Sequence, residues 1–404
     1  MNILGIETSC DETAVCLIEA EGEFGPSFKF RVLGNALHSQ IATHAPYGGV
    51  YPNLAKREHA KNLVPLLEQV LEQASYARNP TNPTSDVGHP MSLIQTMLER
   101  EPELLKALEE FLPTHGRPDI DAIAVTHGPG LEPALWVGIN FARALSAVWD
   151  IPIVPVNHLE GHITMAAVSH PNTSLYNEVL GLEAFEFPAL ALLISGGHTQ
   201  IDLMLEWGSF KTIGETRDDA VGEAFDKVAR MLGIPYPGGA ALSTLAAKAR
   251  QRNEATPRGD ASLRLPRPMI HDDSYDFSFS GLKTAVLRLI DKHELSEDEK
   301  MKIALEFENA ATDVLVAKTV RAAEEYGAKT VVVGGGVSAN SYIKELLSSA
   351  LQATGCKLLA PPPALATDNA LMIALAGYFR ALKNEFIDPD SLRADGNLRL
   401  GQKI

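Results

Sequence analysis

Short apolar runs alternate with amphipathic stretches along this chain, and the alternation predicts an α/β protein. Four apolar runs have the length and residue types of buried strands, at residues 3–6, 122–125, 189–194 and 330–333. Four longer stretches show apolar residues at helical spacing, at residues 55–74, 219–232, 282–292 and 298–326. Strands and helices that alternate in this way indicate sheets covered by helices.

The same two motifs occur twice in the same order. Residues 3–18 and residues 189–205 each have the pattern of a hairpin with small polar or glycine residues at the turn. Each hairpin is followed later by a strand, a glycine-rich turn and a helix, over residues 122–148 and 330–351. Because the order repeats as well as the type, we predict two duplicated α/β lobes facing each other across a cleft, rather than two unrelated domains.

The repeat also suggests domain boundaries. We predict an N-terminal lobe over residues 1–155, a C-terminal lobe over residues 156–380 that carries the metal and nucleotide sites, and a segment 381–404 that returns to the first lobe. Residues 75–117 are expected to be an insertion in the first lobe. It opens with a turn-rich loop at residues 78–86 and continues as an acidic helical piece at residues 91–111.

Composition and charge narrow the class of protein. The chain has 404 residues, of which 45% are hydrophobic, and its net charge is −16. These values are typical of a globular protein and argue against general affinity for nucleic-acid backbones. Residues 248–267 depart from this balance, with six basic and two acidic residues, a local charge of +4. That segment either contacts phosphates or forms a solvated loop.

The cysteines and the lengths of the apolar runs indicate in which cellular compartment the protein works. The apolar runs are too short to cross a bilayer, so we expect no contact with a membrane. Cys10, Cys16 and Cys356 are widely spaced and form no CxxC pair, which favours a reducing compartment. No export or organelle-import signal is visible. We therefore expect a cytoplasmic protein.

Two histidines have the spacing of metal ligands. On a helix His158 and His162 lie about 40° apart, so both imidazoles can reach one ion. Glu160 lies about 200° from His158 and cannot act as the glutamate of a His-Glu-x-x-His protease. Asp368, which opens an apolar helix, is a candidate third ligand, although it can equally be a helix N-cap. Two structural histidines are the alternative interpretation of the pair.

Glycine-rich turns at four strand ends point to a nucleotide-sized cleft. Gly334, Gly336 and Ala339 match a dinucleotide-binding pattern, but the acidic residue expected about 20 positions further on is missing, so we discount NAD. The P-loop pattern is absent from the sequence. Asp226 can bind a ribose hydroxyl or simply lie on a solvated helix face.

Six motifs together resemble the universal tRNA threonylcarbamoyltransferase family, in the right order and over nearly the whole chain. They are residues 1–13 (MNILGIETSCDET), 157–162 (NHLEGH), 194–199 (ISGGHT), 276–284 (DFSFSGLKT), 334–340 (GGGVSAN) and 367–369 (TDN). Residues 39–40 and 47–52 resemble the bacterial or organellar branch. The resemblance implies the two-lobed actin/hexokinase/heat-shock-ATPase (ASKHA) fold, built from duplicated RNase H-like domains.

The resemblance also implies a reaction. The donor is threonylcarbamoyl-AMP, and the acceptor is N6 of the adenosine next to the anticodon in tRNAs that read codons beginning with A. AMP is released. The family uses one divalent metal ion, iron or zinc, and the ligand types do not decide between them. The bacterial branch works with a paralogue that lacks the metal site, a small ATPase, and a separate synthetase that supplies the donor.

The matching motifs also imply roles for individual residues of this chain. The resemblance implies that His158, His162 and Asp368 are metal ligands. It implies a substrate-binding set consisting of Leu193, Ile194, Ser195, Gly196, Gly197, Asp226, Gly239 and Asn340. Asp11 and Glu12, at the tip of the first hairpin, are our candidates for accepting or steering the amine proton, with plain turn chemistry as the alternative.

Three other functions stay open at this level. A small-molecule kinase can use the same fold, because fold does not fix function. A metallopeptidase is suggested by the helical histidine pair, and Glu160 counts against it. A non-catalytic scaffold that binds nucleotide is the third.

Overall fold

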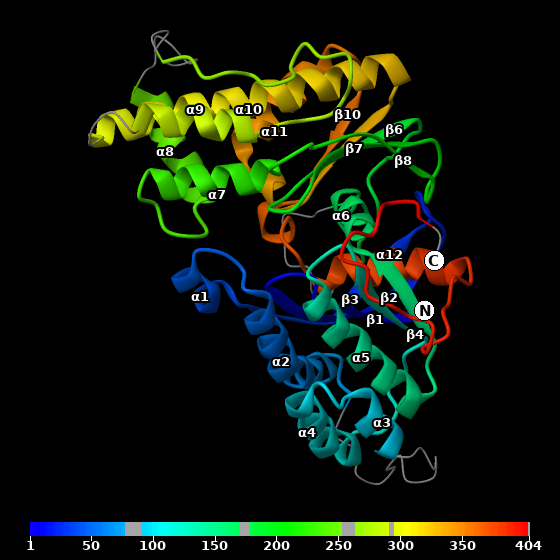
Figure 1. Ribbon diagram of the computed structural model, residues 1–404. Helices are drawn as coiled ribbons and strands as arrows, with labels where there is room; N and C mark the ends of the chain where they lie inside the picture. Colours follow the sequence, from blue (N-terminus) through cyan, green and yellow to red (C-terminus); the bar gives the residue numbers. More distant parts are fainter. Residues whose placement is uncertain (77–90, 170–177, 253–262, 291–294, 403–404) are drawn as a thin grey trace. The chain divides into compact units, whose positions relative to one another are not determined.

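The chain folds into two units, each built on its own five-stranded sheet (Figure 1). The computed structural model describes residues 1–76, 91–169, 178–252, 263–290 and 295–402. Unit 1 comprises Met1–Ala184 and Asp368–Ile404, and unit 2 comprises Phe185–Thr367. These bounds differ from the lobes predicted at 1–155 and 156–380. Residues 156–184 and 368–380 belong to unit 1, because the helices they contain pack on its sheet and on each other.

The two sheets have matching topology. In unit 1 the order is β3 (Lys29–Ser39), β2 (Glu12–Glu21), β1 (Asn2–Glu7), β4 (Ala122–Gly128) and β5 (Ile153–Asn157). In unit 2 the corresponding order is β8 (Phe210–Glu215), β7 (Thr199–Met204), β6 (Ala189–Ile194), β9 (Thr330–Gly334) and β10 (Lys357–Leu359). In each sheet the first three strands are antiparallel and the last two run parallel to the central strand. The predicted duplication is confirmed.

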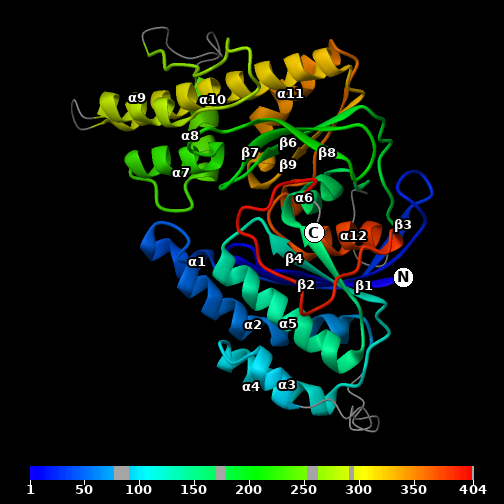
Figure 2. The same cartoon turned by 45° about the vertical axis from the view of Figure 1, so that its right-hand side comes forward.

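Helices cover both faces of the unit 1 sheet (Figures 1 and 2). On one face lie α2 (Pro52–Gln73) and α5 (Glu132–Trp149), and on the other lies α12 (Ala370–Leu382). In β1, Leu4 and Ile6 belong to the core under α2 and α5, while Gly5 between them faces α12. Alternation along the strand explains this division. The shorter helices are α1 (Ile41–His44), η1 (Ala45–Tyr47), η3 (Leu112–Thr114) and α6 (His158–Ala166).

Two helices of the predicted insertion pack on unit 1, one against α2 and the other against α5. The sequence predicted one helical piece at residues 91–111, and the structure has α3 (Met91–Met97) and α4 (Pro102–Phe111). The chain breaks before Pro102, because the residue that precedes a proline disfavours helical backbone. Leu104, Leu108 and Phe111 of α4 are buried. The loop predicted at residues 78–86 lies outside the described residues.

Unit 2 contains five helices of more than one turn within its described residues, the longest of which is α10. These are α7 (Val221–Met231), α8 (Gly239–Arg252), α9 (Ser280–Ile290), α10 (Glu297–Tyr326) and α11 (Ser341–Gln352), with short turns η4 (Gly336–Ala339) and η5 (Pro363–Leu365). A capping box of Ser296 and Glu299 starts α10, and Gly327 in the left-handed conformation ends it. The helices predicted at 219–232 and 298–326 are confirmed within a few residues. The one predicted at 282–292 runs into residues outside the described part. Within the described part of the chain, no helix is both long and apolar enough to span a membrane.

Candidate functional site

Helix α6 brings the two predicted histidines together. Asn157 starts the helix, since its side-chain oxygen accepts a hydrogen bond of 2.9 Å from the backbone N–H of Leu159. The four-residue spacing then places the imidazoles of His158 and His162 edge to face, with ring centroids 4.7 Å apart. Both side chains are buried. A pair of buried imidazoles on one helix face can share one ligand.

Asp368 meets both imidazoles at one oxygen. Its Oδ1 lies 3.1 Å from Nε2 of His162 and 3.3 Å from Nε2 of His158. The three potential ligand atoms all lie within 4.8 Å of one another. The alternative of an N-cap at Asp368 is wrong, because Asn369 caps α12 by accepting a hydrogen bond of 3.0 Å from Met372. The cap therefore leaves Asp368 to face the histidines.

Glycines let α12 come close enough for this contact. A Cβ at Gly5 would lie 2.4 Å from the Ala370 carbonyl oxygen, at the start of α12. A Cβ at Gly377 would lie 2.3 Å from Cβ of Ala124 in β4. Side chains at these positions would push α12 off the sheet. The close approach fixes where Asp368, one residue before the cap, stands.

Two groups of this cluster carry charge, the carboxylate of Asp368 and the imidazole of His158. Burial lowers the pKa of His158, but Asp368 and Glu7 outweigh it, and the pKa ends well above its usual value. Burial lowers the pKa of His162, and the contact with Asp368 does not compensate. Burial raises the pKa of Asp368, yet the two histidines hold it well below its usual value. The buried carboxylate is thus ionised, as a metal ligand must be.

Two residues that were not predicted from the sequence, Glu7 and Ser9, orient His158 through its Nδ1. Its Nδ1 lies 3.1 Å from Oε2 of Glu7 and 3.1 Å from Oγ of Ser9. Glu7 is itself held by Thr126, whose hydroxyl donates to Oε2 at 2.7 Å. A carboxylate that contacts one imidazole nitrogen leaves the other nitrogen to face the metal ion. Histidines that bind metals usually have such a partner. Glu7 is the last residue of β1, and no local pattern in the sequence indicates that it contacts a histidine so far along the chain.

Glu7→Gln should weaken metal binding while leaving the fold intact. Glutamine keeps the size of the side chain but no longer places a carboxylate on Nδ1 of His158. Loss of such a partner lowers metal affinity about 10- to 100-fold. Titration with zinc against a fluorescent chelator measures the change, and Glu132→Gln, an exposed position in unit 1, is the matched control. Equal affinity in both variants would contradict the assignment.

The donor set fits one divalent metal ion. Two imidazole nitrogens and one carboxylate oxygen are the ligands of many catalytic zinc and non-haem iron sites, which keep open positions for substrate. The two imidazoles are buried, Asp368 is half-buried, and the carboxylate of Glu7 supports His158. These features agree with a metal centre and do not choose between iron and zinc.

Asp11 and Glu12 lie at the start of β2 in the same unit. Asp11 is buried, and its carbonyl accepts a hydrogen bond of 2.9 Å from the backbone N–H of Gln40. Burial raises the pKa of Glu12, and the charges of Asp368 and Asp11 raise it further. Glu12 therefore lies within the electrostatic reach of Asp368. The catalytic role of Asp11 and Glu12 stays a prediction.

A buried chain of hydrogen bonds supports this turn. The backbone N–H of Tyr51 donates to Nδ1 of His44 (3.2 Å), and Nε2 of His44 donates to the side-chain oxygen of Gln40 (3.0 Å). The amide nitrogen of Gln40 donates to Nδ1 of His59 (3.2 Å), and Nε2 of His59 donates to the Cys10 carbonyl (3.0 Å). The chain has a backbone donor at one end and a backbone acceptor at the other. These two ends determine which nitrogen of each imidazole carries the hydrogen and which way the Gln40 side-chain amide points. Burial lowers the pKa of His59, so its imidazole is neutral in this chain of hydrogen bonds.

The neutral state of His59 predicts a pH dependence of stability. Burial lowers the pKa of His59 to about 4. Between this value and the ordinary value of about 6.5 the unfolded chain binds a proton that the folded chain does not, so stability falls as the pH is lowered through this window. The loss is about 3 kcal/mol at most for one such group.

Urea unfolding between pH 4 and pH 7 measures this effect. We expect His59→Gln to flatten the dependence relative to the parent protein. His127, whose pKa burial also lowers to about 4, titrates in both proteins and cancels in the comparison. An NMR titration of the parent protein that finds the His59 imidazole protonating near pH 6.5 would contradict the prediction.

Glu160 has a structural role between the two histidines. Its Oε2 accepts hydrogen bonds from Nε (2.8 Å) and Nη2 (2.7 Å) of Arg380 near the end of α12. The ion pair thus joins the helix that carries both histidines to the helix that follows Asp368. This confirms that Glu160 faces away from the imidazoles, and it leaves the residue no place as a peptidase base.

The predicted nucleotide turn of unit 2 follows β6. Leu193 and Ile194 are buried at the end of the strand, and the Ser195 hydroxyl accepts a hydrogen bond of 3.0 Å from the His198 amide. Side chains at Gly196 and Gly197 would meet no atom within 4 Å, so the backbone here is open. Gly335, with φ +88°, comes so close that a Cβ would lie 2.5 Å from the Ile194 carbonyl oxygen. The two glycine turns therefore meet, as nucleotide-binding turns do.

The remaining three predicted residues lie around the start of α8. Oδ1 of Asp226 accepts hydrogen bonds from the amides of Gly238 (2.9 Å) and Gly239 (2.8 Å), so the alternative of a solvated helix face is wrong. Asn340 caps α11 with its oxygen and donates to Ser243 of α8 at 3.0 Å. Asp226 and Asn340 thus hold α7, α8 and α11 in place. Their contact with a ligand stays a prediction.

The basic segment at residues 248–267 is partly neutralised within unit 2. Arg250 donates to Glu308 at 2.8 Å and lies 3.5 Å from the ring centre of Tyr342. Arg267 pairs with Glu306 and Asp313. These two guanidinium groups support the fold, which favours internal compensation over phosphate contact for them. Residues 253–262 lie outside the described part.

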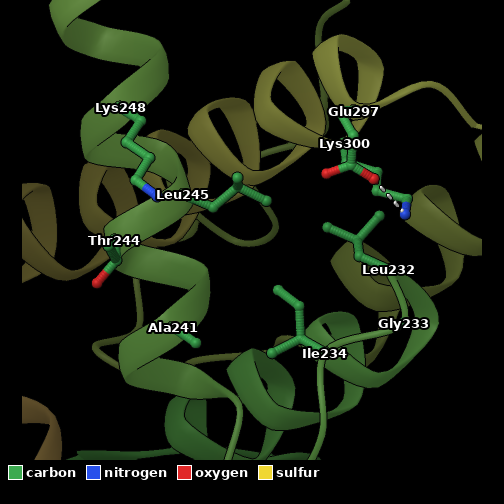
Figure 3. A pocket seen from close by; sticks show the side chains of 9 residues that line it. All are labelled: Leu232, Gly233, Ile234, Ala241, Thr244, Leu245, Lys248, Glu297 and Lys300. Carbon is green, nitrogen blue, oxygen red and sulfur yellow. Dashed lines mark hydrogen bonds and ion pairs between the residues drawn. The ribbon is translucent and has the colours of Figure 1, made fainter.

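A pocket of unit 2 has none of the predicted site residues in its lining. Figure 3 shows its lining, in which Leu232, Ile234 and Leu245 meet between the end of α7, α8 and the start of α10. Its volume is about 470 Å³. Lys300 and Glu297 at its edge pair with each other at 2.8 Å. The pocket carries no cluster of chemically reactive groups among these lining residues.

The duplicated sheets define the class of protein, which is the actin-like ATPase (ASKHA) fold. A solved structure with this likeness is full-length HypF in its phosphate- and nucleotide-bound form, with a TM-score of 0.50 and 14% identity. The match covers 95% of this chain and 46% of that one. At this identity the likeness concerns the fold alone.

The chain belongs to the tRNA N6-adenosine threonylcarbamoyltransferase (TsaD) family, a family of transferases. The family's sequence model matches residues 31–80 and 102–375. The relative from Persephonella marina that bears this name is 40% identical over 407 residues, covering 100% of this chain and 97% of its own. The relative from Burkholderia mallei is 43% identical over 387 residues, covering 94% and 92%. The resemblance inferred from the six motifs is confirmed.

Proposed function

We propose that this chain transfers the threonylcarbamoyl group from threonylcarbamoyl-AMP to N6 of the adenosine next to the anticodon, with release of AMP. The His158–His162–Asp368 cluster carries the proposal, because it supplies a buried metal-binding set where two family motifs meet. Family membership supports the substrate and the reaction class. It also argues against the kinase and scaffold alternatives.

The transfer requires the protein to orient the amine and the donor more than to activate either of them. The exocyclic amine of adenine is a weak nucleophile, because its lone pair is delocalised into the ring. The donor is a mixed anhydride and is already activated, so the protein mainly orients the two reactants and stabilises developing charge. A metal ion held by His158, His162 and Asp368 would supply Lewis-acid polarisation of the donor's carbonyl.

The chain's own residues complete the assignment. We assign binding of the donor's adenylate part to unit 2, with the open backbone of Gly196 and Gly197 available to the phosphate and the Asp226–Gly239 turn and Asn340 as further contacts. Glu7 holds His158 in its tautomer, and Asp11 or Glu12 accepts or steers the proton that leaves the amine. We prefer Asp11 as the acceptor, because burial raises the pKa of Glu12 and so favours its protonated form.

Partners and location follow from the same proposal. A tRNA is the acceptor, and a synthetase must supply the donor. The paralogue without a metal site and the small ATPase, expected from the bacterial branch, would assist this acidic chain in handling RNA. The cytoplasmic location stays a prediction.

Modification of unmodified tRNA tests the function. The chain is mixed with purified donor and tRNA, with and without the partner proteins, and label on N6 of the adenosine is measured. Transfer that requires His158 and His162 supports the proposal. Release of peptides, or steady phosphoryl transfer to a sugar in place of base modification, would overturn it.

A further inference from the structure

Two tyrosines stand out on the surface of unit 1. Tyr47 has 66% of its surface exposed, the largest share among the exposed large apolar side chains of the described residues, and Tyr51 has 54%. Their rings stack on each other, with centroids 6.1 Å apart and planes 24° apart. Tyr47 ends η1 and Tyr51 is the N-cap of α2, so both lie on the short segment between α1 and α2. Figure 1 labels these two helices.

The base of this aromatic pair is rigid. The backbone N–H of Tyr51 is the first donor in the buried hydrogen-bond chain through His44, Gln40 and His59. These three side chains have no measurable exposure. A satisfied buried network specifies one conformation. The rings are therefore exposed but stand on an ordered support.

The same chain of hydrogen bonds connects the rings to the candidate proton acceptors. Its last acceptor is the Cys10 carbonyl, directly before Asp11. The backbone N–H of Gln40 also donates a hydrogen bond of 2.9 Å to the Asp11 carbonyl. The tyrosines and the tip of the first hairpin are thus parts of one hydrogen-bonded assembly within unit 1. A ligand that stacks on the rings would be held in register with this tip.

Charge and chemistry indicate what such a ligand is. Residues 37–61 contain Lys56, Arg57 and Lys61 against Glu58. Lys56 pairs with Glu101 at 2.9 Å, so the exposed cations of this segment are Arg57 and Lys61. Exposed aromatic rings beside cations recognise unstacked bases of single-stranded RNA loops. The proposed reaction requires a loop base to leave its stack and reach the protein. A polyanionic loop therefore suits this surface better than an acidic protein does.

We propose that Tyr47 and Tyr51 form a stacking platform for a nucleobase of the acceptor's anticodon loop, fixed relative to Asp11 by the buried chain. This inference rests on the proposed function and names a binding surface for its RNA substrate. The two rings act by binding and positioning and take no part in proton transfer.

Substitution at the rings separates stacking from other contacts. In the full chain, together with any partner proteins that transfer requires, Tyr47→Ala and Tyr51→Ala should each lower affinity for an anticodon stem-loop about 10- to 100-fold. Tyr→Phe at both positions should keep affinity within about twofold, because the π-face remains. Tyr→Leu should behave like alanine. Leu205→Ala, an exposed apolar site in unit 2, is the matched control.

The measurements are stem-loop affinity by fluorescence anisotropy, KM for tRNA and for donor, and zinc affinity. The expected pattern is a raised KM for tRNA with unchanged KM for donor and unchanged zinc affinity. Alanine variants that bind and modify tRNA like the parent, or leucine variants that match phenylalanine, would overturn the inference. So would a loss confined to association with a partner protein. If the parent protein itself fails to modify tRNA, it is the proposed function that fails.

Discussion

His162→Ala should abolish both metal retention and threonylcarbamoyl transfer. Its Nε2 is one of three ligand atoms that converge in a buried cluster, and the other two are too few to hold an ion firmly. Removal of an outer partner alone costs about 10- to 100-fold in metal affinity, so loss of a direct ligand should cost more than 100-fold. We expect the same of His158→Ala.

Metal analysis after dialysis, followed by the transfer assay, measures this prediction. His271→Ala, an exposed histidine of unit 2, should retain metal and activity. Treatment of the parent protein with a chelator should reproduce the His162→Ala defect, and added iron or zinc should reverse it only in the parent. Full metal occupancy in His162→Ala would show that the cluster is structural.

Asp368 and Asn369 allow the ligand and the helix cap to be told apart. Asp368→Asn keeps the size of the side chain and removes its charge, so metal affinity should fall by the same order as for His162→Ala. Asn369→Ala removes the cap of α12 and should cost about 1 kcal/mol of stability with metal still bound. Chemical denaturation and zinc titration of both variants separate the two effects.

Much of this architecture could be read from the chain because it depends on local periodicity. Apolar runs predicted the central strands, and their repeated order predicted two sheets of one topology. The i, i+4 spacing of His158 and His162 likewise predicted that they share a helix face. Local pattern is sufficient where the relevant neighbours are close in sequence.

The rest depends on contacts between distant segments. Asp368 could not be distinguished from a helix cap until the neighbouring Asn369 was seen to cap α12. Glu7 and Arg380 were missed because their partners lie 151 and 220 positions away. The boundary predicted at residue 380 failed for the same reason. The apolar sequence of α12 does not reveal which sheet it covers, and Gly5 and Ala124 make it pack in unit 1.

The Glu160–Arg380 pair should make a large contribution to the stability of unit 1. Glu160 is only 3% exposed, and burial raises its pKa against the opposing effect of Arg380. Replacement of one partner leaves the other charge without its main partner in the interior, which typically costs about 3–5 kcal/mol. Arg380 also contacts the exposed Glu385 at 3.0 Å, so Glu160→Ala should lie near the lower end of this range.

A double-mutant cycle tests whether the ion pair acts as a unit. Glu160→Met leaves the half-buried Arg380 without this partner, and Arg380→Met leaves the buried Glu160 without it. The double variant leaves neither charge and fills the space with apolar groups. We expect the double variant to recover most of the stability lost by either single variant, because desolvation of both charges is avoided. Urea unfolding of the four proteins gives the coupling energy.

The same four proteins test how the pair affects the metal centre. Glu160 lies on the helix that carries both histidines, and Arg380 lies on the helix that begins after Asp368, so the ion pair sets the register of α6 against α12. A double variant that regains stability but binds zinc more weakly than the parent would show that the charges specify this register. The opposite result is that each single variant loses less than about 1 kcal/mol of unfolding free energy and that the two losses add. In that case the close packing of Gly161 against Met372 is the main constraint between the two helices.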